Sequence, residues 1–176
     1  MSDDPRYPIG KFKHQGPLDE GQRAQMIGDI ERTPAALRSA IAGLSTQQLE
    51  TPYREGGWNV RQVIHHLPDS HMNAYVRFKL ALTEHEPTIK PYAEDLWAKS
   101  PDNESTPIEV SLILLESLHR RWVYLLTSLG PEDWKRSFRH PETDRLVSLE
   151  RNLAIYSWHG RHHVAHITEL RKRMGW

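Results

Sequence analysis

Four histidines lie within eight residues near the carboxyl end of the sequence, at positions 159, 162, 163 and 166. Residues four apart share one face of a helix, with Cβ atoms about 5–6 Å apart. Two pairs are therefore possible, His159 with His163 and His162 with His166. At that separation, two imidazoles can reach one metal ion at the usual Zn–N distance of roughly 2.0–2.1 Å. The spacing indicates a metal site on a helix.

A helical wheel at roughly 100° per residue separates the two pairs. Its apolar stripe consists of Leu149, Leu153, Tyr156, Ile167, Leu170 and Met174. His163 falls within this stripe and His159 about 40° to its side, whereas His162 and His166 lie nearer the edge. A buried imidazole must satisfy both ring nitrogens, and a metal does this for the inward pair. The alternative is hydrogen-bonded core or rim histidines, and we expect His162 and His166 to be surface or supporting groups.

Two ligands do not complete a site, and an earlier helical segment offers His65, His66 and His71. The wheel places His71 nearest the apolar centre, His66 well to one side and His65 on the outer face. Pro68 is expected to kink this helix and so to change the phase between His66 and His71. Periodicity therefore favours His71 only weakly, and the residues alone leave the third ligand open.

Composition limits the function classes that remain. The 176 residues suit one domain with one core, which we predict to span 1–176 with an extended arm over 1–17. Lys plus Arg and Asp plus Glu each number 23, and this balance argues against a general nucleic-acid binder. The sequence has no cysteine, which excludes thiolate zinc sites and cysteine nucleophiles. Without a signal-peptide pattern or a membrane-length apolar run, we expect a cytoplasmic protein with no membrane partner.

The histidines are expected to sit on long amphipathic helices. The first helical stretch covers 19–43, where Thr33 and Pro34 are typical of an N-cap and a first helical position and so predict an interruption. The second begins near Asn59, which has Gln62 as capping-box partner, and continues to about residue 84. A short helical turn is expected between them at 45–50.

Two further long helices follow a polar, proline-rich segment with a short helix at 93–98. The third is predicted to begin after a Thr106 cap and to stop at Gly130. Its apolar residues at helical spacing are Val110, Leu114, Leu118, Trp122, Leu125 and Leu129. After an irregular excursion over 131–147, Ser148 can cap a fourth helix over 149–174. No segment alternates like a substantial sheet, so the pattern predicts an all-α four-helix bundle.

Five stretches resemble the YfiT group of the DinB/YfiT-like four-helix-bundle superfamily. They are YPIG (7–10), TPYREGGWNVRQVIHHLPDSHMNAYVRFKLALTE (51–84), LHRRW (118–122), YSWHGRHHVAHITEL (156–170) and RMGW (173–176). The resemblance implies an up-down-down-up bundle, a homodimer, and a metal held by three histidines. The first ligand lies eight residues after the tryptophan of the motif, here Trp58, and so falls on His66. The other two fall on His159 and His163, while Pro68 departs from the small residue expected there.

The resemblance implies one divalent transition metal per chain, and because ligation by nitrogen alone suits several such metals, we expect zinc or nickel. Three nitrogens leave coordination positions open, where a metal can acidify water or polarise a carbonyl. We therefore expect a metal-dependent hydrolase with a small-molecule substrate. The sequence contains no H-E-x-x-H, so no general base is assigned. Candidate supporting groups are Asp69, Asn73, His162 and Glu169.

Two alternatives remain open. Several members of the superfamily resemble S-transferases that use a low-molecular-weight thiol such as bacillithiol, and a metal would hold that thiol as thiolate. Basic residues that could bind an anionic thiol are Arg54, Arg61, Arg77, Lys79, Arg120, Arg121 and Arg161. The second alternative is a structural or sensing site, which a fourth ligand such as His71 or His162 would favour. The scattered His14, His85, His119 and His140 predict no special role.

Overall fold

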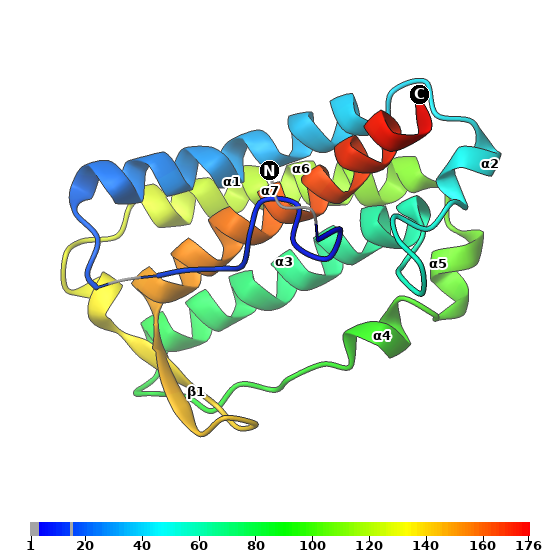
Figure 1. Cartoon of the computed structure of the whole chain (residues 1–176). Helices are drawn as coiled ribbons and strands as arrows, with labels where there is room; N and C mark the ends of the chain where they lie inside the picture. Colours follow the sequence, from blue (N-terminus) through cyan, green and yellow to red (C-terminus); the bar gives the residue numbers. More distant parts are fainter. Residues whose placement is uncertain (1–3, 15) are drawn as a thin grey trace.

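Four long helices form the body of the molecule in the computed structural model, which describes residues 4–14 and 16–176 (Figure 1). They are α1 (Glu20–Ile41), α3 (Val60–Thr83), α6 (Ile108–Thr127) and α7 (Leu149–Met174). Followed along the chain, α1 and α7 run in one direction and α3 and α6 in the other. This confirms the predicted all-α four-helix bundle with up-down-down-up topology.

The connections between the long helices carry short elements. They are α2 (Thr46–Leu49), α4 (Glu94–Trp97), α5 (Pro101–Ser105), the 3-10 helix η1 (Asp133–Lys135), and the antiparallel strands β1 (Ser137–His140) and β2 (Arg145–Ser148). The helical turns predicted at 45–50 and 93–98 are confirmed. The excursion predicted to be irregular contains the hairpin instead, because four-residue strands are too short for alternation to reveal them.

Side-chain caps define where α3 and α7 begin. Asn59 accepts a hydrogen bond from the backbone N–H of Gln62, and the Gln62 side chain accepts one from the backbone N–H of Asn59. This confirms the predicted capping box, and Ser148 caps α7 as predicted. The Thr106 cap was wrong: α6 begins after Pro107, and Thr106 instead terminates α5.

The first helix passes through Pro34 without the predicted interruption. Thr33 is not an N-cap, because its hydroxyl donates to the backbone carbonyl of Asp29 one turn earlier. Pro68 likewise lies inside α3. A proline removes one backbone hydrogen bond from a helix, but packing of the apolar face supplies most of a helix's stability in a folded protein. Both helices therefore continue through their prolines.

The core runs along the bundle as two apolar clusters, one around Trp122 and one around Leu115. The buried residues of α6 are Ser111, Leu112, Leu115, His119, Trp122 and Leu126. Val110 and Leu114, which the predicted stripe included, are 53% and 41% exposed. Apolar residues occur on several faces of α6, so helical spacing alone selected the wrong face for them.

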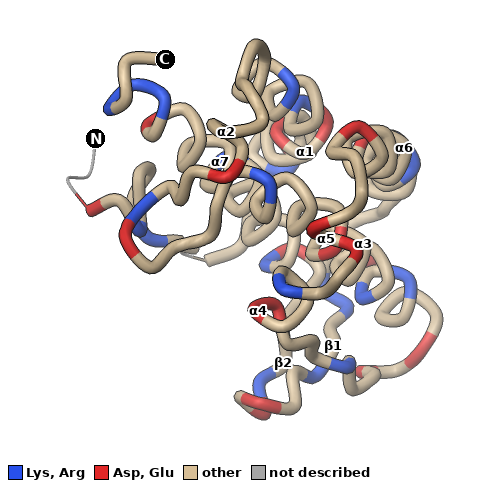
Figure 2. The backbone as a smooth tube through the Cα atoms, turned by 90° about the vertical axis from the view of Figure 1, so that its right-hand side faces the viewer, with Lys and Arg blue, Asp and Glu red and all other residues tan. Residues whose placement is uncertain are grey.

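The surface of the bundle is mixed in charge. Figure 2 shows basic and acidic residues interspersed over the described helices, in line with their equal numbers. A search of the described residues finds no helix that combines the length and the apolar character needed to cross a bilayer. The surface therefore has the balanced character that the composition predicted.

Candidate metal centre

Three histidine rings from two helices converge inside the bundle. Nε2 of His159 lies 3.3 Å from Nε2 of His66 and 3.2 Å from Nε2 of His163. Among the described residues, these three form the group of potential ligands that can share one ion, with ligand atoms within 4.8 Å of one another. Two nitrogens that each lie 2.0–2.1 Å from a tetrahedral ion are about 3.3 Å apart. The observed separations therefore match a metal-sized centre.

Local structure brings the three rings together. The i, i+4 spacing on α7 places His159 and His163 on one face, and packing of α3 beside α7 supplies His66. Trp58, just before the α3 cap, packs on His66 with ring centroids 4.6 Å apart and stacks on His163 at 6.3 Å. Its indole N–H donates to Asp95 in the segment that connects α3 to α6. Trp58 therefore holds two of the rings from one side.

Burial keeps the three rings neutral. It lowers the pKa of His66 to about 4. The pKa values of His159 and His163 lie well below the ordinary value, because of burial first and neighbouring histidines second. Neutral imidazole is the form that binds metals. Two unprotonated nitrogens that face each other at 3.2 Å need a shared proton or a cation between them, so the donor set fits a metal ion.

His162 and His166 were expected to be surface or supporting groups, and the surface alternative is wrong because they are buried, at 8% and 3% exposure. Their Nε2 atoms lie 3.0 Å apart. Trp158 stacks on His162 and Tyr53 on His166, and Tyr7 of the amino-terminal arm lies near His162. The wheel failed here because it considers one helix alone, whereas the arm and the segment before α3 cover this face.

The α3 histidines also differ from the prediction in part. His65 was expected on the outer face but is buried, with its Nδ1 2.7 Å from Ser111 Oγ on α6. His71 is fully buried, as the wheel predicted, and its Nε2 lies 3.1 Å from Nδ1 of His159. His71 thus contacts the far nitrogen of the His159 ring. The structure brings His66, and not His71, to the shared centre.

A polar cavity of about 480 Å³ opens onto this centre. Its walls come from the amino-terminal arm, the segment before α3, α4 and the α7 histidines, including Arg6, Arg54, Glu94 and His162. Asp69, Asn73 and Glu169 are not among the lining residues. Burial, helped by nearby Asp102, raises the pKa of Asp69 to about 6. Of the four supporting candidates, only His162 therefore reaches the cavity.

The predicted basic groups are dispersed. Arg54 lines the histidine cavity, and Arg77 lines a neighbouring cavity that shares His159. Arg61 and Arg161 form ion pairs with Glu50 and Asp29. Arg120 lines a groove between α1 and α6. Arg54 is therefore the member of this set best placed to meet a molecule at the histidine centre.

The sequence provided no role for His119, which the structure places at the middle of the bundle. It is 1% exposed, its Nε2 lies 2.8 Å from Nδ1 of His71, and its Nδ1 lies 2.6 Å from the carbonyl oxygen of Ile30. A lone histidine on a helix carries little signal. The available indication that His119 is buried was its position one turn before Trp122, on the same face of α6.

We expect His119 to make stability depend on pH. Burial lowers its folded-state pKa to about 4, whereas an unfolded histidine has a pKa of about 6.5. Below pH 6.5 the unfolded chain gains a proton that the native state excludes. The contribution of His119 to the free energy of unfolding is therefore fully present above pH 6.5 and is lost as the pH falls toward 4. Between pH 6 and 4.5, the wild-type free energy of unfolding should fall by roughly 1 kcal/mol per pH unit more than that of His119→Gln. Urea unfolding in chelator measures this, and equal slopes would contradict it.

Comparison with known proteins identifies the family. A family model described as the DinB superfamily matches residues 29–167. This chain belongs to the DinB superfamily. Relatives from Bacillus cereus and Bacillus anthracis are each 56% identical over 98% of this chain and 99% of their own length, and both are named "Putative metal-dependent hydrolase". The solved structure of YfiT from Bacillus subtilis matches with a TM-score of 0.95 and 48% identity over 98% of both chains. That protein is described as a probable metal-dependent hydrolase with an unusual four-helix bundle topology.

Proposed function

We propose that this chain is a hydrolase that depends on one divalent metal ion held by Nε2 of His66, His159 and His163. The observation that carries the proposal is the convergence of three neutral imidazoles with Nε2 separations of 3.2 and 3.3 Å. The names of the Bacillus relatives support the reaction class. Held by three protein nitrogens, such an ion supplies Lewis-acid chemistry at its open positions.

Zinc or nickel is the proposed occupant. All three donors are imidazole nitrogens, which suit zinc, nickel, copper and iron, whereas magnesium and calcium prefer oxygen. The cavity beside the histidines is large enough for a small-molecule substrate. Trp58 orients His66 and His163, and the cavity walls bring polar side chains to any molecule bound there.

A structural or sensing site is less well supported. A closed zinc site has four protein ligands as a rule. His71, one of the two candidates for a fourth ligand, points its Nε2 at Nδ1 of His159. His162, the other candidate, has its Nε2 beside His166. Among the described residues the group that can share an ion therefore has three members, which favours an open site.

A low-molecular-weight-thiol transferase is the second candidate function, and Arg54 favours it. Its guanidinium lines the histidine cavity, and its Nε is buried without a hydrogen-bond partner among the described residues. A guanidinium in this position can bind the carboxylate of an anionic thiol. The Arg54→Gln variant should then lose thiol affinity while it retains metal.

The experiment is metal content followed by two assays on untagged protein. We expect about one zinc or nickel per chain, and hydrolysis of chromogenic esters or amides that chelator abolishes and metal restores. Turnover that requires an added thiol, with loss of free thiol, would replace the hydrolase with the transferase. Metal-free protein that takes up neither zinc nor nickel would overturn both.

We also propose that the chain forms a cytoplasmic homodimer. Exposed apolar side chains on α6 support an interface between two copies: Val110 and Ile113 are each 53% exposed and Tyr124 is 71% exposed. Val110 and Ile113 lie within one turn of α6, and exposed apolar surface of this kind marks contacts between proteins. Sedimentation equilibrium should give twice the mass of one chain, and a mass of one chain would contradict the dimer.

A further inference from the structure

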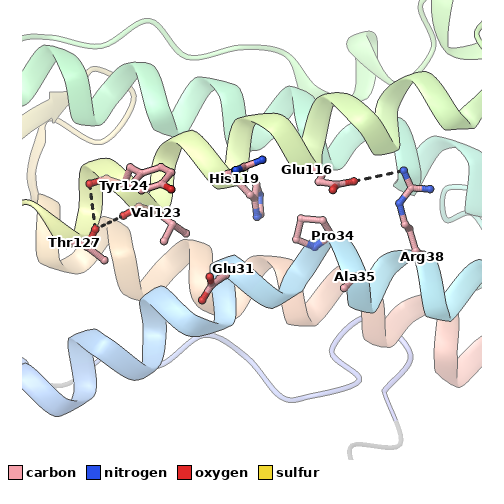
Figure 3. Close-up of a pocket in the computed structure, with 10 residues that line it drawn as sticks. Glu31, Pro34, Ala35, Arg38, Glu116, His119, Val123, Tyr124 and Thr127 are labelled. Atoms are coloured by element: carbon pink, nitrogen blue, oxygen red, sulfur yellow. Dashed lines mark hydrogen bonds and ion pairs between the residues drawn. The ribbon is translucent and has the colours of Figure 1, made fainter.

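His159, His71 and His119 form a continuous chain of hydrogen bonds that crosses the bundle. Nδ1 of His159 on α7 lies 3.1 Å from Nε2 of His71 on α3, and Nδ1 of His71 lies 2.8 Å from Nε2 of His119 on α6. Nδ1 of His119 lies 2.6 Å from the carbonyl oxygen of Ile30 on α1. Figure 3 shows His119 between α6 and α1, beside Pro34. Each of the four long helices therefore contributes one residue.

The Ile30 carbonyl sets the direction of the whole chain. A carbonyl oxygen can only accept, so His119 must donate from Nδ1. A neutral imidazole carries one N–H, so Nε2 of His119 must accept, and His71 must donate to it from Nδ1. By the same reasoning Nε2 of His71 accepts, and His159 donates from Nδ1. The hydrogen of His159 then lies on the nitrogen that faces away from the metal centre.

Burial of the histidines in this series of hydrogen bonds favours this one set of hydrogen positions. His71 is 0% and His119 1% exposed, which leaves water little access to their nitrogens. Their hydrogen-bond partners are other imidazoles and one backbone carbonyl, with no carboxylate to balance a positive charge, so both buried rings are neutral. His163 differs, because its Nδ1 is buried without a hydrogen-bond partner among the described residues. Of the two α7 histidines at the centre, only His159 is therefore held by this series of hydrogen bonds.

We propose that His71 and His119 are positioning residues that hold His159 in its Nδ1–H tautomer and keep the Nε2 lone pair directed at the centre shared with His66 and His163. This inference rests on the proposed metal site. Without an acceptor at position 119, His71 can place its hydrogen on Nε2 and donate to Nδ1 of His159. His159 would then carry its own hydrogen on Nε2, the atom that must bind the ion.

Two substitutions at position 119 separate hydrogen bonding from packing. Leucine fills similar space but offers no acceptor, whereas the amide oxygen of glutamine can take the place of Nε2 and accept from His71. Loss of partners that orient ligands typically reduces metal affinity by about 10–100-fold. We therefore expect His119→Leu to weaken zinc binding by that factor and His119→Gln to stay within a few-fold of wild type. The measurement is competition with a chromophoric zinc chelator.

The tautomers can be read without metal. In metal-free protein with ¹⁵N-labelled histidine rings, nitrogen shifts distinguish protonated from unprotonated nitrogens, and single-histidine variants assign the signals. We expect hydrogen on Nδ1 of His159, His71 and His119 in wild type, and hydrogen on Nε2 of His159 in a substantial fraction of His119→Leu. The glutamine variant should keep the wild-type pattern.

These experiments distinguish failure of the positioning role of His71 and His119 from failure of the metal site. Hydrogen on Nε2 of His159 in wild-type protein, or native zinc affinity in a folded His119→Leu, would overturn the positioning role. Should the leucine variant not fold, the wild-type tautomers still decide the question. If wild type binds neither zinc nor nickel but shows the predicted tautomers, the proposed function alone is refuted.

Discussion

His163→Ala is expected to abolish stoichiometric metal binding. His163 presents Nε2 3.2 Å from Nε2 of His159, and alanine leaves two donors that cannot hold an ion in competition with water. Loss of a group that merely orients a ligand costs roughly 10–100-fold in affinity, so loss of a ligand should cost about 100-fold or more. Metal content after gel filtration should fall from about one per chain to near zero. His66→Ala and His159→Ala should behave alike.

The matched control is His65→Asn, next to His66 in sequence. His65 is equally buried but directs its Nδ1 to Ser111 Oγ, away from the centre. Asparagine keeps a polar nitrogen near the Nδ1 position, so the variant should fold and retain about one metal per chain. Full metal content in His163→Ala, or loss of metal in the folded His65→Asn, would remove the basis for assigning the site.

Gly160→Ala is expected to destabilise the bundle where α1 crosses α7. A Cβ at position 160 would lie 2.6 Å from Thr33 Oγ1 and 2.9 Å from Thr33 Cγ2. Thr33 is 2% exposed and its hydroxyl donates to Asp29, so it has little freedom to move. Overpacking of this kind costs about 1–3 kcal/mol, more than the 0.5–1 kcal/mol or so that alanine gains over glycine in a helix. Each kcal/mol should lower Tm by roughly 2–4 °C.

A second substitution tests whether this contact is the cause. Thr33→Ala removes the two closest atoms and leaves only the Thr33 Cβ, at 3.3 Å from the added carbon. In the Thr33→Ala background, Gly160→Ala should therefore be neutral or stabilising. Thermal unfolding of the two single variants, the double variant and wild type completes the cycle. A Gly160→Ala protein as stable as wild type would show that α1 and α7 can separate without penalty.

The sequence alone determined the helical architecture and two of the three residues at the centre, His159 and His163. Capping residues such as Asn59 and Ser148 act within a few residues of themselves, so local pattern was enough to place the starts of α3 and α7. The His159–His163 pair followed from helical spacing for the same reason. The third residue at the centre, His66, came from resemblance to a family, because the wheel weakly favoured His71 and left the third ligand open.

Only the tertiary structure decided which histidines share a centre and which support it. A helical wheel treats one helix in isolation, so it could not foresee that the amino-terminal arm and Tyr53 cover His162 and His166. It also could not show that His71 and His119 from two other helices line up behind His159. Local sequence sets where a helix begins and which residues share a face. Contacts between residues 48 to 93 positions apart depend on how the helices pack, and hydrogen-bond geometry exists only after they have packed.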